Sequence, residues 1–487
     1  MENFILTLII FILVISILVF VHELGHYFAA KKVGIKVEEF AIGMGPRIWG
    51  FRRGETEYNL RVLPIGGFVK MLGEGDYDLV SPDSYGGKKP SQRLLVLVAG
   101  VFMNFLLAIL LLYLQGWHQD FKYRNIEGFF QEEFKPWFGE KSENKFIIQD
   151  INESSPLSGK VDRFDILTKI DGKEYTPEGL SEILISKSGQ NVELTFLKYD
   201  SSAEKTVSIY VSPIDKDLVG KDNSPLAVIA GFAENSPLKD KVKATDVVKA
   251  INGEKYNIKD FRNIIESYKG KTVNLTITDL SGENVREIQV ELQNIDRPLG
   301  VIFIPNNSPD ALLGVSAGQI SLIEFNGNSK LFAGIGQALN TVQNFSFSIS
   351  QLFKKYYESG SAVPLVDNVG GAIGIFEILG SIIVLFGFWG VIELMALFSI
   401  NLAVLNILPI PALDGGHVVF TLIEMITRKK LHTKFYNYLT LAGFIFLMSF
   451  MVFVTAMDLV KYTFVRSWLC EDGRYVSFVC DLSDMRR

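Results

Sequence analysis

The chain has 487 residues, of which 48% are hydrophobic, and its formal net charge is −6. It is too long for a single ordinary domain, and its mean hydropathy of +0.23 is too high for a soluble enzyme. The small negative charge gives no indication of a nucleic-acid partner. Because a polar region at residues 120–310 lies between strongly apolar stretches, we expect a membrane protein with a soluble insert.

The first predicted element is a membrane helix over residues 4–28, within an N-terminal segment at 1–30. The 19 residues before His22 carry no charge after Glu2, and at ~1.5 Å each they nearly cross a hydrocarbon layer of ~30 Å. His22 and His26 are four residues apart, so they share one helix face and can bind one Zn²⁺. The glutamate between them, Glu23, is placed to take a proton from a metal-bound water. The pattern predicts metal chemistry inside a membrane.

The next segment, residues 31–93, is polar and carries eleven lysines and arginines. So many positive charges in a short loop indicate the cytoplasmic side of a membrane. Residues 57–64 and 67–72 alternate between apolar and polar side chains, as strands do. With a turn at Gly66 and Gly67, they predict a β-hairpin over 58–72.

Three further apolar stretches complete the predicted membrane region. We expect spans at residues 94–117, 380–408 and 435–462, because each contains a long run with few or no charges. The loop at 409–434 is basic, so it lies on the same cytoplasmic side as 31–93. The soluble insert and the tail at 463–487 then lie on the opposite side. Both cysteines, Cys470 and Cys480, are in this tail, and their spacing leaves a disulfide and two unpaired thiols equally open.

The insert contains an internal repeat with an offset of 81 residues. The motif Glu-Ser-Ser-Pro-Leu at 153–157 returns as Glu-Asn-Ser-Pro-Leu at 234–238, and Ile-Asp-Gly at 170–172 returns as Ile-Asn-Gly at 251–253. We therefore predict two homologous modules at 144–214 and 225–294. A linker at 295–377 with amphipathic segments follows them.

A catalytic zinc ion usually has three protein ligands, and the two histidines supply only two of them. Asp414 is the best candidate for the third. It follows two prolines, Pro409 and Pro411, and precedes two glycines, so the helix is broken at membrane depth. Irregular backbone is tolerated there only where it is buried in protein or lines a wet cavity, and a carboxylate there needs a partner. A purely structural reading, with Asp414 as a helix cap, stays the alternative. His417 is the competing candidate for a ligand, but three residues beyond Asp414 we expect it to pack beside the site or orient it.

These motifs together resemble the site-2 protease family (M50) of intramembrane zinc metalloproteases. The resemblance rests on the helix-borne His-Glu-Leu-Gly-His at 22–26, on Asn-Ile-Leu-Pro-Ile-Pro-Ala-Leu-Asp-Gly-Gly at 406–416, and on the repeated insert. Within the family the chain is similar to the bacterial regulator of sigma-E protease branch, which has four spans and tandem PDZ domains. The implied fold class is a polytopic α-helical membrane protein with four transmembrane helices, a membrane-associated β-hairpin and an inserted pair of α/β PDZ domains.

The resemblance also implies roles for individual residues. His22, His26 and Asp414 would be the ligands of Zn²⁺, and Glu23 would be the catalytic base. The residues that would contact or position the substrate are Asn104, Asn406, Pro409, Pro411, Gly66 and Gly67. The family's usual Gly-Pro before the asparagine of the second span is Gly100-Val101 here.

The implied function is regulated intramembrane proteolysis in a bacterial inner membrane. A single-span substrate, such as a trimmed anti-sigma factor or a signal-peptide remnant, would be cut within its helix near the cytoplasmic side. The extracytoplasmic PDZ modules would filter substrates by size or bind peptide C-termini. The competing hypothesis is a non-catalytic membrane scaffold, although a scaffold does not require Glu23 between the two histidines. A sporulation-type protease is disfavoured because that branch lacks the tandem insert.

Overall fold

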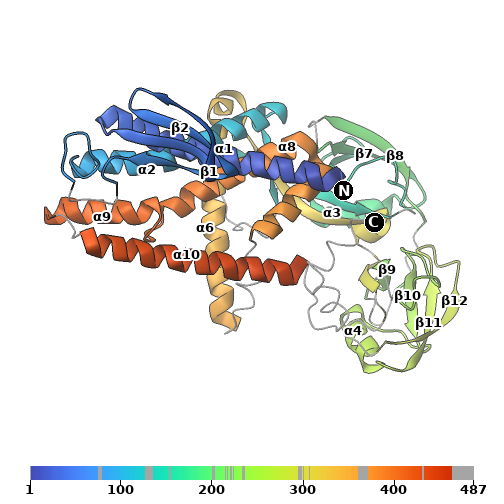
Figure 1. Cartoon of the computed structure of the whole chain (residues 1–487). Coiled ribbons are helices and arrows are strands. Elements are labelled where there is room, and N and C mark those ends of the chain that lie inside the picture. The colour runs from blue at the N-terminus through green and yellow to red at the C-terminus, as the bar shows by residue number, and fades with distance from the viewer. Residues whose placement is uncertain are drawn as a thin grey trace.

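The structure is a computed structural model of the whole chain. It describes residues 2–74, 79–126, 135–152, 155–199, 203–213, 215, 218–219, 222, 224–232, 236–293, 299, 301–306, 308–359, 371–429 and 433–462. A bundle of long helices lies beside two lobes that contain most of the strands (Figure 1). The tail at 463–487 with its two cysteines lies outside the described residues.

In the part of the chain that the structure describes, four helices are long and apolar enough to cross a membrane, which agrees with the expected number of candidate spans. They are α1 (Glu2–Val33), α2 (Pro90–His118), α8 (Ala372–Ile407) and α10 (Thr433–Tyr462). The largest difference from the predicted bounds is in α8, which begins eight residues before position 380. Its backbone turns sharply at Gly387, where φ is +57° and ψ is −146°. A glycine is required at this bend because side chains disfavour that conformation.

The core of the bundle is formed by small and branched side chains of α1, α2 and α8. Leu18, Ala108 and Ala396 are buried there, together with Ile400. Gly25 lets α1 approach α2 closely, because a Cβ at this position would lie 2.3 Å from the carbonyl oxygen of Ala99. The histidine-bearing turn of α1 is therefore fixed directly against the second span.

The β-element beside α1 and α2 differs from the predicted hairpin. Strands β1 (Val37–Arg53) and β2 (Thr56–Met71) are antiparallel, and the chain turns between them at Gly54 rather than at Gly66. Both predicted strands belong to β2, whose two halves both pair with residues 39–42 of β1, on opposite edges. The prediction was wrong about the pairing partner because alternation within 57–72 does not show which strand lies next to it.

The first lobe is built around a seven-stranded sheet. Its strands in chain order are β3 (Lys122–Ile126), β4 (Glu140–Lys141), β5 (Lys145–Ile151), β6 (Ile166–Ile170), β7 (Asn191–Leu197), β8 (Glu204–Tyr210) and β14 (Val315–Glu324). The spatial order is β3-β14-β5-β6-β7-β8, with β4 also paired to β14. Thr176 is the N-cap of helix α3 (Pro177–Ser186), and its side chain accepts a hydrogen bond from the backbone N–H of Gly179.

The second lobe contains a five-stranded sheet and helix α4 (Ile258–Ser267). Its strands are β9 (Ala227–Phe232), β10 (Val247–Ile251), β11 (Thr272–Thr278), β12 (Arg286–Glu291) and β13 (Val301–Pro305), in the spatial order β12-β11-β10-β9-β13. Helix α5 (Pro309–Leu313) then leads into β14, which returns to the first lobe. The second module is therefore inserted into the first, and β14 lies beyond the range 144–214 expected for that module.

Equivalent hydrogen bonds support the 81-residue repeat. The hydroxyl of Ser155 donates to the carbonyl of Leu313, and that of Ser236 donates to the carbonyl of Leu299. In the same way, the Tyr175 hydroxyl donates to a strand carbonyl of β6, and Tyr256 donates to the matching carbonyl of β10. The two lobes therefore share equivalent structural features at equivalent positions of the repeat.

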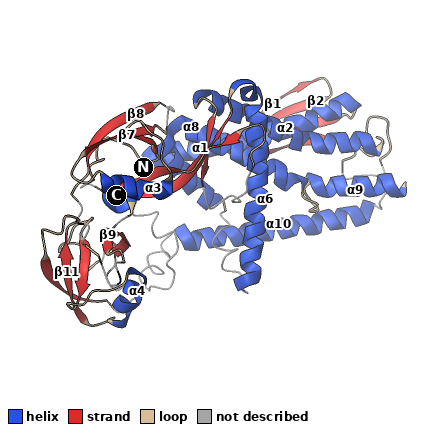
Figure 2. Cartoon of the chain, turned by 180° about the vertical axis from the view of Figure 1, so that it is seen from behind, coloured by secondary structure: helices blue, strands red, loops and turns tan. Residues whose placement is uncertain are grey.

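The region expected as a linker at 295–377 contains regular structure. After β14, the 3-10 helix η2 (Gly327–Phe332) leads into α6 (Ala333–Ser359), which runs across the direction of the bundle helices (Figure 2). Gly334 lets α6 reach α2, since a Cβ there would lie 2.5 Å from the carbonyl oxygen of Ile109. Helix α9 (Asp414–Thr427) lies between α8 and α10 in the chain.

Candidate metal centre

The first part of the site comes from the C-terminal half of α1. His22 and His26 are one helical turn apart, and both side chains are buried against α2. The backbone carbonyl of Val96 lies 2.9 Å from Nδ1 of His26. If Nδ1 carries the proton and donates it to this carbonyl, Nε2 of His26 keeps its lone pair facing the site.

The second part of the site comes from a broken helix. Helix α8 ends at Ile407, the chain turns through Ala412 with φ of +81°, and Asp414 is the first residue of α9. Gly415 and Gly416 make this tight path possible, because added Cβ atoms would lie 2.2 Å and 2.4 Å from backbone oxygens of the same loop. A carboxylate at a helix N-terminus is also stabilised by the helix dipole.

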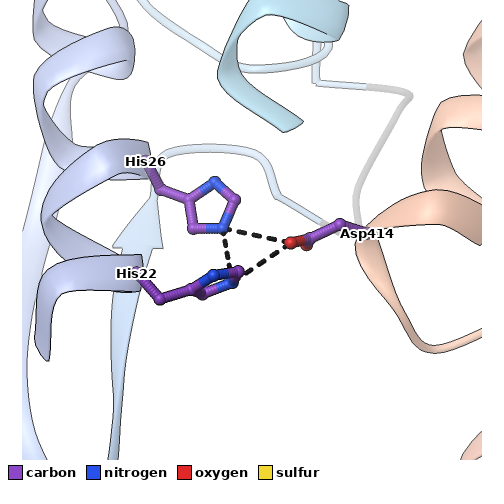
Figure 3. A group of neighbouring side chains, drawn as sticks. All are labelled: His22, His26 and Asp414. Atoms are coloured by element: carbon purple, nitrogen blue, oxygen red, sulfur yellow. Dashed lines mark hydrogen bonds and ion pairs between the residues drawn. The ribbon is translucent and has the colours of Figure 1, made fainter. Parts of the chain in front are cut away.

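The three side chains converge from opposite sides, as Figure 3 shows. Oδ2 of Asp414 lies 3.1 Å from Nε2 of His22 and 3.4 Å from Nε2 of His26, and the two Nε2 atoms are 3.1 Å apart. Two ligands of a tetrahedral zinc, each bound at ~2.0–2.1 Å, are about 3.3 Å apart. The spacing of the donor atoms therefore fits one zinc ion.

Hydrogen bonding around the site also fits a metal. Oδ2 of Asp414 is buried without a hydrogen-bond partner within the part of the chain that the structure describes. The side-chain amide of Asn104 lies 3.2 Å from Nδ1 of His22, and its own Oδ1 is buried and unpartnered there. Turning this amide by 180° lets Oδ1 accept the Nδ1 proton, which leaves Nε2 of His22 as a metal ligand. Asn104 is thus suited to orient His22.

A glycine of α2 provides the space for both imidazoles. A Cβ at Gly100 would lie 2.4 Å from Nε2 of His26 and 2.8 Å from Cε1 of His22. The sequence showed Gly100 only as a departure from the family's Gly-Pro pair. Its contact with the histidines depends on how α1 and α2 pack, and no local pattern shows that.

The second half of β2 lies directly beside Glu23. The backbone N–H of Val69 donates to the Glu23 carboxylate, and a Cβ at Gly67 would lie 3.7 Å from Cγ of Glu23. Gly66, with φ of +86°, contacts Met44 rather than the site. Of the two predicted glycines, Gly67 is therefore the one beside the glutamate.

A further carboxylate, Glu74, interacts electrostatically with Glu23, His26 and Asp414. Its Oε2 accepts a hydrogen bond of 3.2 Å from the backbone N–H of Met71. Glu74 is exposed to solvent. Glu74 directly follows β2 and belongs to no recognisable sequence motif.

Comparison with known proteins identifies the chain's relatives. Residues 10–450 match Peptidase family M50. The chain belongs to this family. A Clostridium perfringens protein named as a zinc metalloprotease is 31% identical to this M50 peptidase over 451 residues, which cover 92% of this chain and 97% of the relative.

Two other relatives align over similar lengths. The protease Eep of Enterococcus faecalis is 29% identical to this M50 peptidase, with 94% of this chain and all of the relative covered. A zinc metalloprotease by name from Thermotoga maritima is 26% identical, with 92% and 98% covered. These names and the donor set agree on Zn²⁺ as the cofactor. This M50 peptidase is therefore a zinc metalloprotease of a membrane.

The other predicted substrate residues surround the break before α9. Asn406 is in the last turn of α8 and is half-buried, Pro409 is exposed in the loop, and Pro411 is half-buried. These three residues lie near Asp414 in the chain. His417 lies in the first turn of α9, three residues after Asp414.

Proposed function

We propose that this M50 peptidase cuts single-span membrane proteins within their membrane helix. The observation that carries this proposal is the convergence of His22, His26 and Asp414 at the end of one membrane-spanning helix, with Glu23 beside them. Substrates of this kind include a trimmed anti-sigma factor and signal-peptide remnants. Such cleavage would be a step of regulated intramembrane proteolysis at a bacterial inner membrane, with the site toward the cytoplasm.

The ligands and the base have separate tasks in this mechanism. His22, His26 and Asp414 would hold zinc, which supplies an acidified water and polarises the scissile carbonyl when bound. Glu23 takes the proton of the attacking water and can return it to the leaving amine. The Val69 N–H holds the Glu23 carboxylate in place.

Residues 67–71 of β2 are suited to hold the substrate in an extended form. One edge of this segment pairs with residues 37–42 of β1, and the other carries the Val69 N–H that faces Glu23. A helical substrate hides its carbonyls in i→i−4 hydrogen bonds, so it must unwind before cleavage. Pairing with a strand edge compensates for the lost bonds.

Replacing Glu23 with Gln tests this function against the scaffold hypothesis. Loss of a general base lowers rates by ~10²–10⁴-fold, so we expect cleavage of a single-span model substrate to fall by that factor while zinc content is unchanged. The matched control is Glu283→Gln, because Glu283 is exposed in the second lobe. Cleavage by Glu23→Gln at the unsubstituted rate would leave the scaffold as the better explanation.

We also propose that the two modules of the insert are PDZ domains and that the second one binds peptide C-termini. Strand β13 closes the second sheet, and in the described chain no strand pairs with its other edge. Phe303 of β13 contacts Phe261 of α4 with ring centroids 4.6 Å apart, which places an apolar strand-and-helix pair beside this edge. In the first module, the equivalent strand β14 is flanked on both sides by β5 and β3.

Peptide binding to the full-length protein tests this assignment. A peptide that ends in a free carboxylate should bind at least tenfold more tightly than its C-terminally amidated form, and Phe303→Ala should weaken binding of the free acid. Equal affinity for the acid and the amide would favour the alternative role of a size filter.

A further inference from the structure

Helix α10 contacts the segment that presents Asp414 at two points. Tyr436 and Gly443 are seven residues apart on α10, so they share one face of the helix. Tyr436 contacts His417, and Gly443 contacts Pro411. Since His417 and Pro411 are each three residues from Asp414, the two contacts flank the carboxylate ligand on both sides.

The first contact is a hydrogen bond combined with ring stacking. The hydroxyl of Tyr436 is hydrogen-bonded to Nδ1 of His417, and the two rings are stacked at an interplanar angle of 29° with centroids 5.2 Å apart. Phe420, one turn further along α9, packs against the same tyrosine at 5.3 Å. Tyr436 is 8% exposed, so this contact is shielded from solvent. It fixes the first turn of α9, which begins with Asp414.

The second contact is a close approach of backbones. A Cβ at Gly443 would lie 2.0 Å from the carbonyl oxygen of Pro411 and 2.6 Å from its carbonyl carbon. The two nearest atoms belong to the backbone of the loop and the third is Cβ of the rigid Pro411 ring, so no flexible side chain could move aside there. Any side chain at 443 must displace α10 or the loop.

We propose that Tyr436 and Gly443 are positioning residues that set the place of the Asp414 carboxylate in the zinc site. This role rests on the proposed zinc-dependent function. Helix α10 would support the site by fixing the segment that presents Asp414. Ligands of a metal depend on the groups that orient them, and loss of such a group typically weakens metal binding by ~10–100-fold. Neither residue touches the donor atoms, so both act through the loop.

Zinc affinity of the full chain, measured by competition with a chelator, tests the proposal. Tyr436→Phe removes a single oxygen and should weaken zinc binding by about 10–100-fold. Gly443→Ala should weaken it by at least as much. The matched control is Tyr438→Phe, because Tyr438 is 72% exposed on another face of α10 and should bind zinc as the unsubstituted chain does.

A double-mutant cycle assigns the effect to the Tyr436–His417 bond. If the bond transmits the effect, His417→Leu combined with Tyr436→Phe should weaken zinc binding no more than His417→Leu alone. Cleavage by Tyr436→Phe should recover when zinc is in excess, with an unchanged KM. A role in general packing would not show this recovery.

The outcomes separate this inference from the proposed function. If the unsubstituted chain neither binds zinc nor cleaves a substrate, the function itself is wrong. If it does both, and Tyr436→Phe and Gly443→Ala bind zinc within twofold of it, only the positioning role is wrong. Should Gly443→Ala fail to fold, Tyr436→Phe still decides the question.

Discussion

Gly100 and Gly25 contribute to the metal centre because neither residue has a side chain. One leaves room for the two imidazoles, and the other lets α1 approach α2. The residues with the chemistry, such as His22 and Asp414, could be predicted because their motifs combine a fixed spacing with a known task. The glycines could not, because their importance comes from contacts between helices that are distant in sequence.

Replacing Gly100 with Ala should therefore abolish zinc binding. The new methyl group would lie 2.4 Å from Nε2 of His26, well inside van der Waals contact, so the imidazole must leave its position. Metal analysis of the purified protein measures this, with Phe102→Leu as the control because Phe102 is exposed on the same helix. A Gly100→Ala protein that retains a full equivalent of zinc would show that the imidazoles are held differently.

At the scale of elements, a buried ion pair connects α2 to α9. Arg93, in the first turn of α2, lies 2.6 Å from the carboxylate of Glu424, and the two side chains are 1% and 10% exposed. The helix that begins with Asp414 is thus attached to the bundle near its other end as well. Neither partner stood out in the sequence, because each is a single charge at the edge of an apolar stretch.

Breaking this pair from one side should destabilise the protein strongly. Arg93→Met leaves the Glu424 carboxylate buried without its partner, and such changes cost about 3–5 kcal/mol. The double variant Arg93→Met with Glu424→Met removes both charges and should regain most of that stability. Thermal unfolding in detergent measures both. If the double variant is as unstable as Arg93→Met alone, the cost comes from lost packing and not from an unpaired charge.

The four spans could be predicted because a charge-free run of membrane length has few alternative structures. Their ends were less certain. Glu377 lies near the start of α8, and a charge there conceals the first two turns of the helix from a search for apolar residues. The β-element was mispaired for a related reason, since strand partners depend on contacts that alternation does not encode.

At the scale of the whole molecule, the first module is completed only by residues beyond the second. Strand β14 lies between β3 and β5, and Leu312, Leu313 and Val315 belong to the core of the first lobe. The internal repeat predicted two modules, but a repeat cannot show that one copy takes a strand from 100 residues further along the chain. Only the three-dimensional structure shows that β14 belongs to the first module.

A soluble fragment of residues 122–214 should therefore fail to fold, while a fragment of residues 122–324 should fold cooperatively. The shorter one lacks β14, an interior strand whose absence exposes the hydrogen-bonding edge of β5 and the apolar side chains beneath it. Limited proteolysis and circular dichroism distinguish the two. A stable, protease-resistant short fragment would mean that β14 is dispensable.

The distance between the ligands along the chain has a consequence for biogenesis. Asp414 follows His26 by 388 residues, and at ~5–20 residues per second a ribosome needs roughly 20–80 s to reach it. During that time only two of the three proposed zinc ligands have been made. If zinc binding needs all three side chains, the chain can become a protease only after the segment with Asp414 has been made and has reached the first helix.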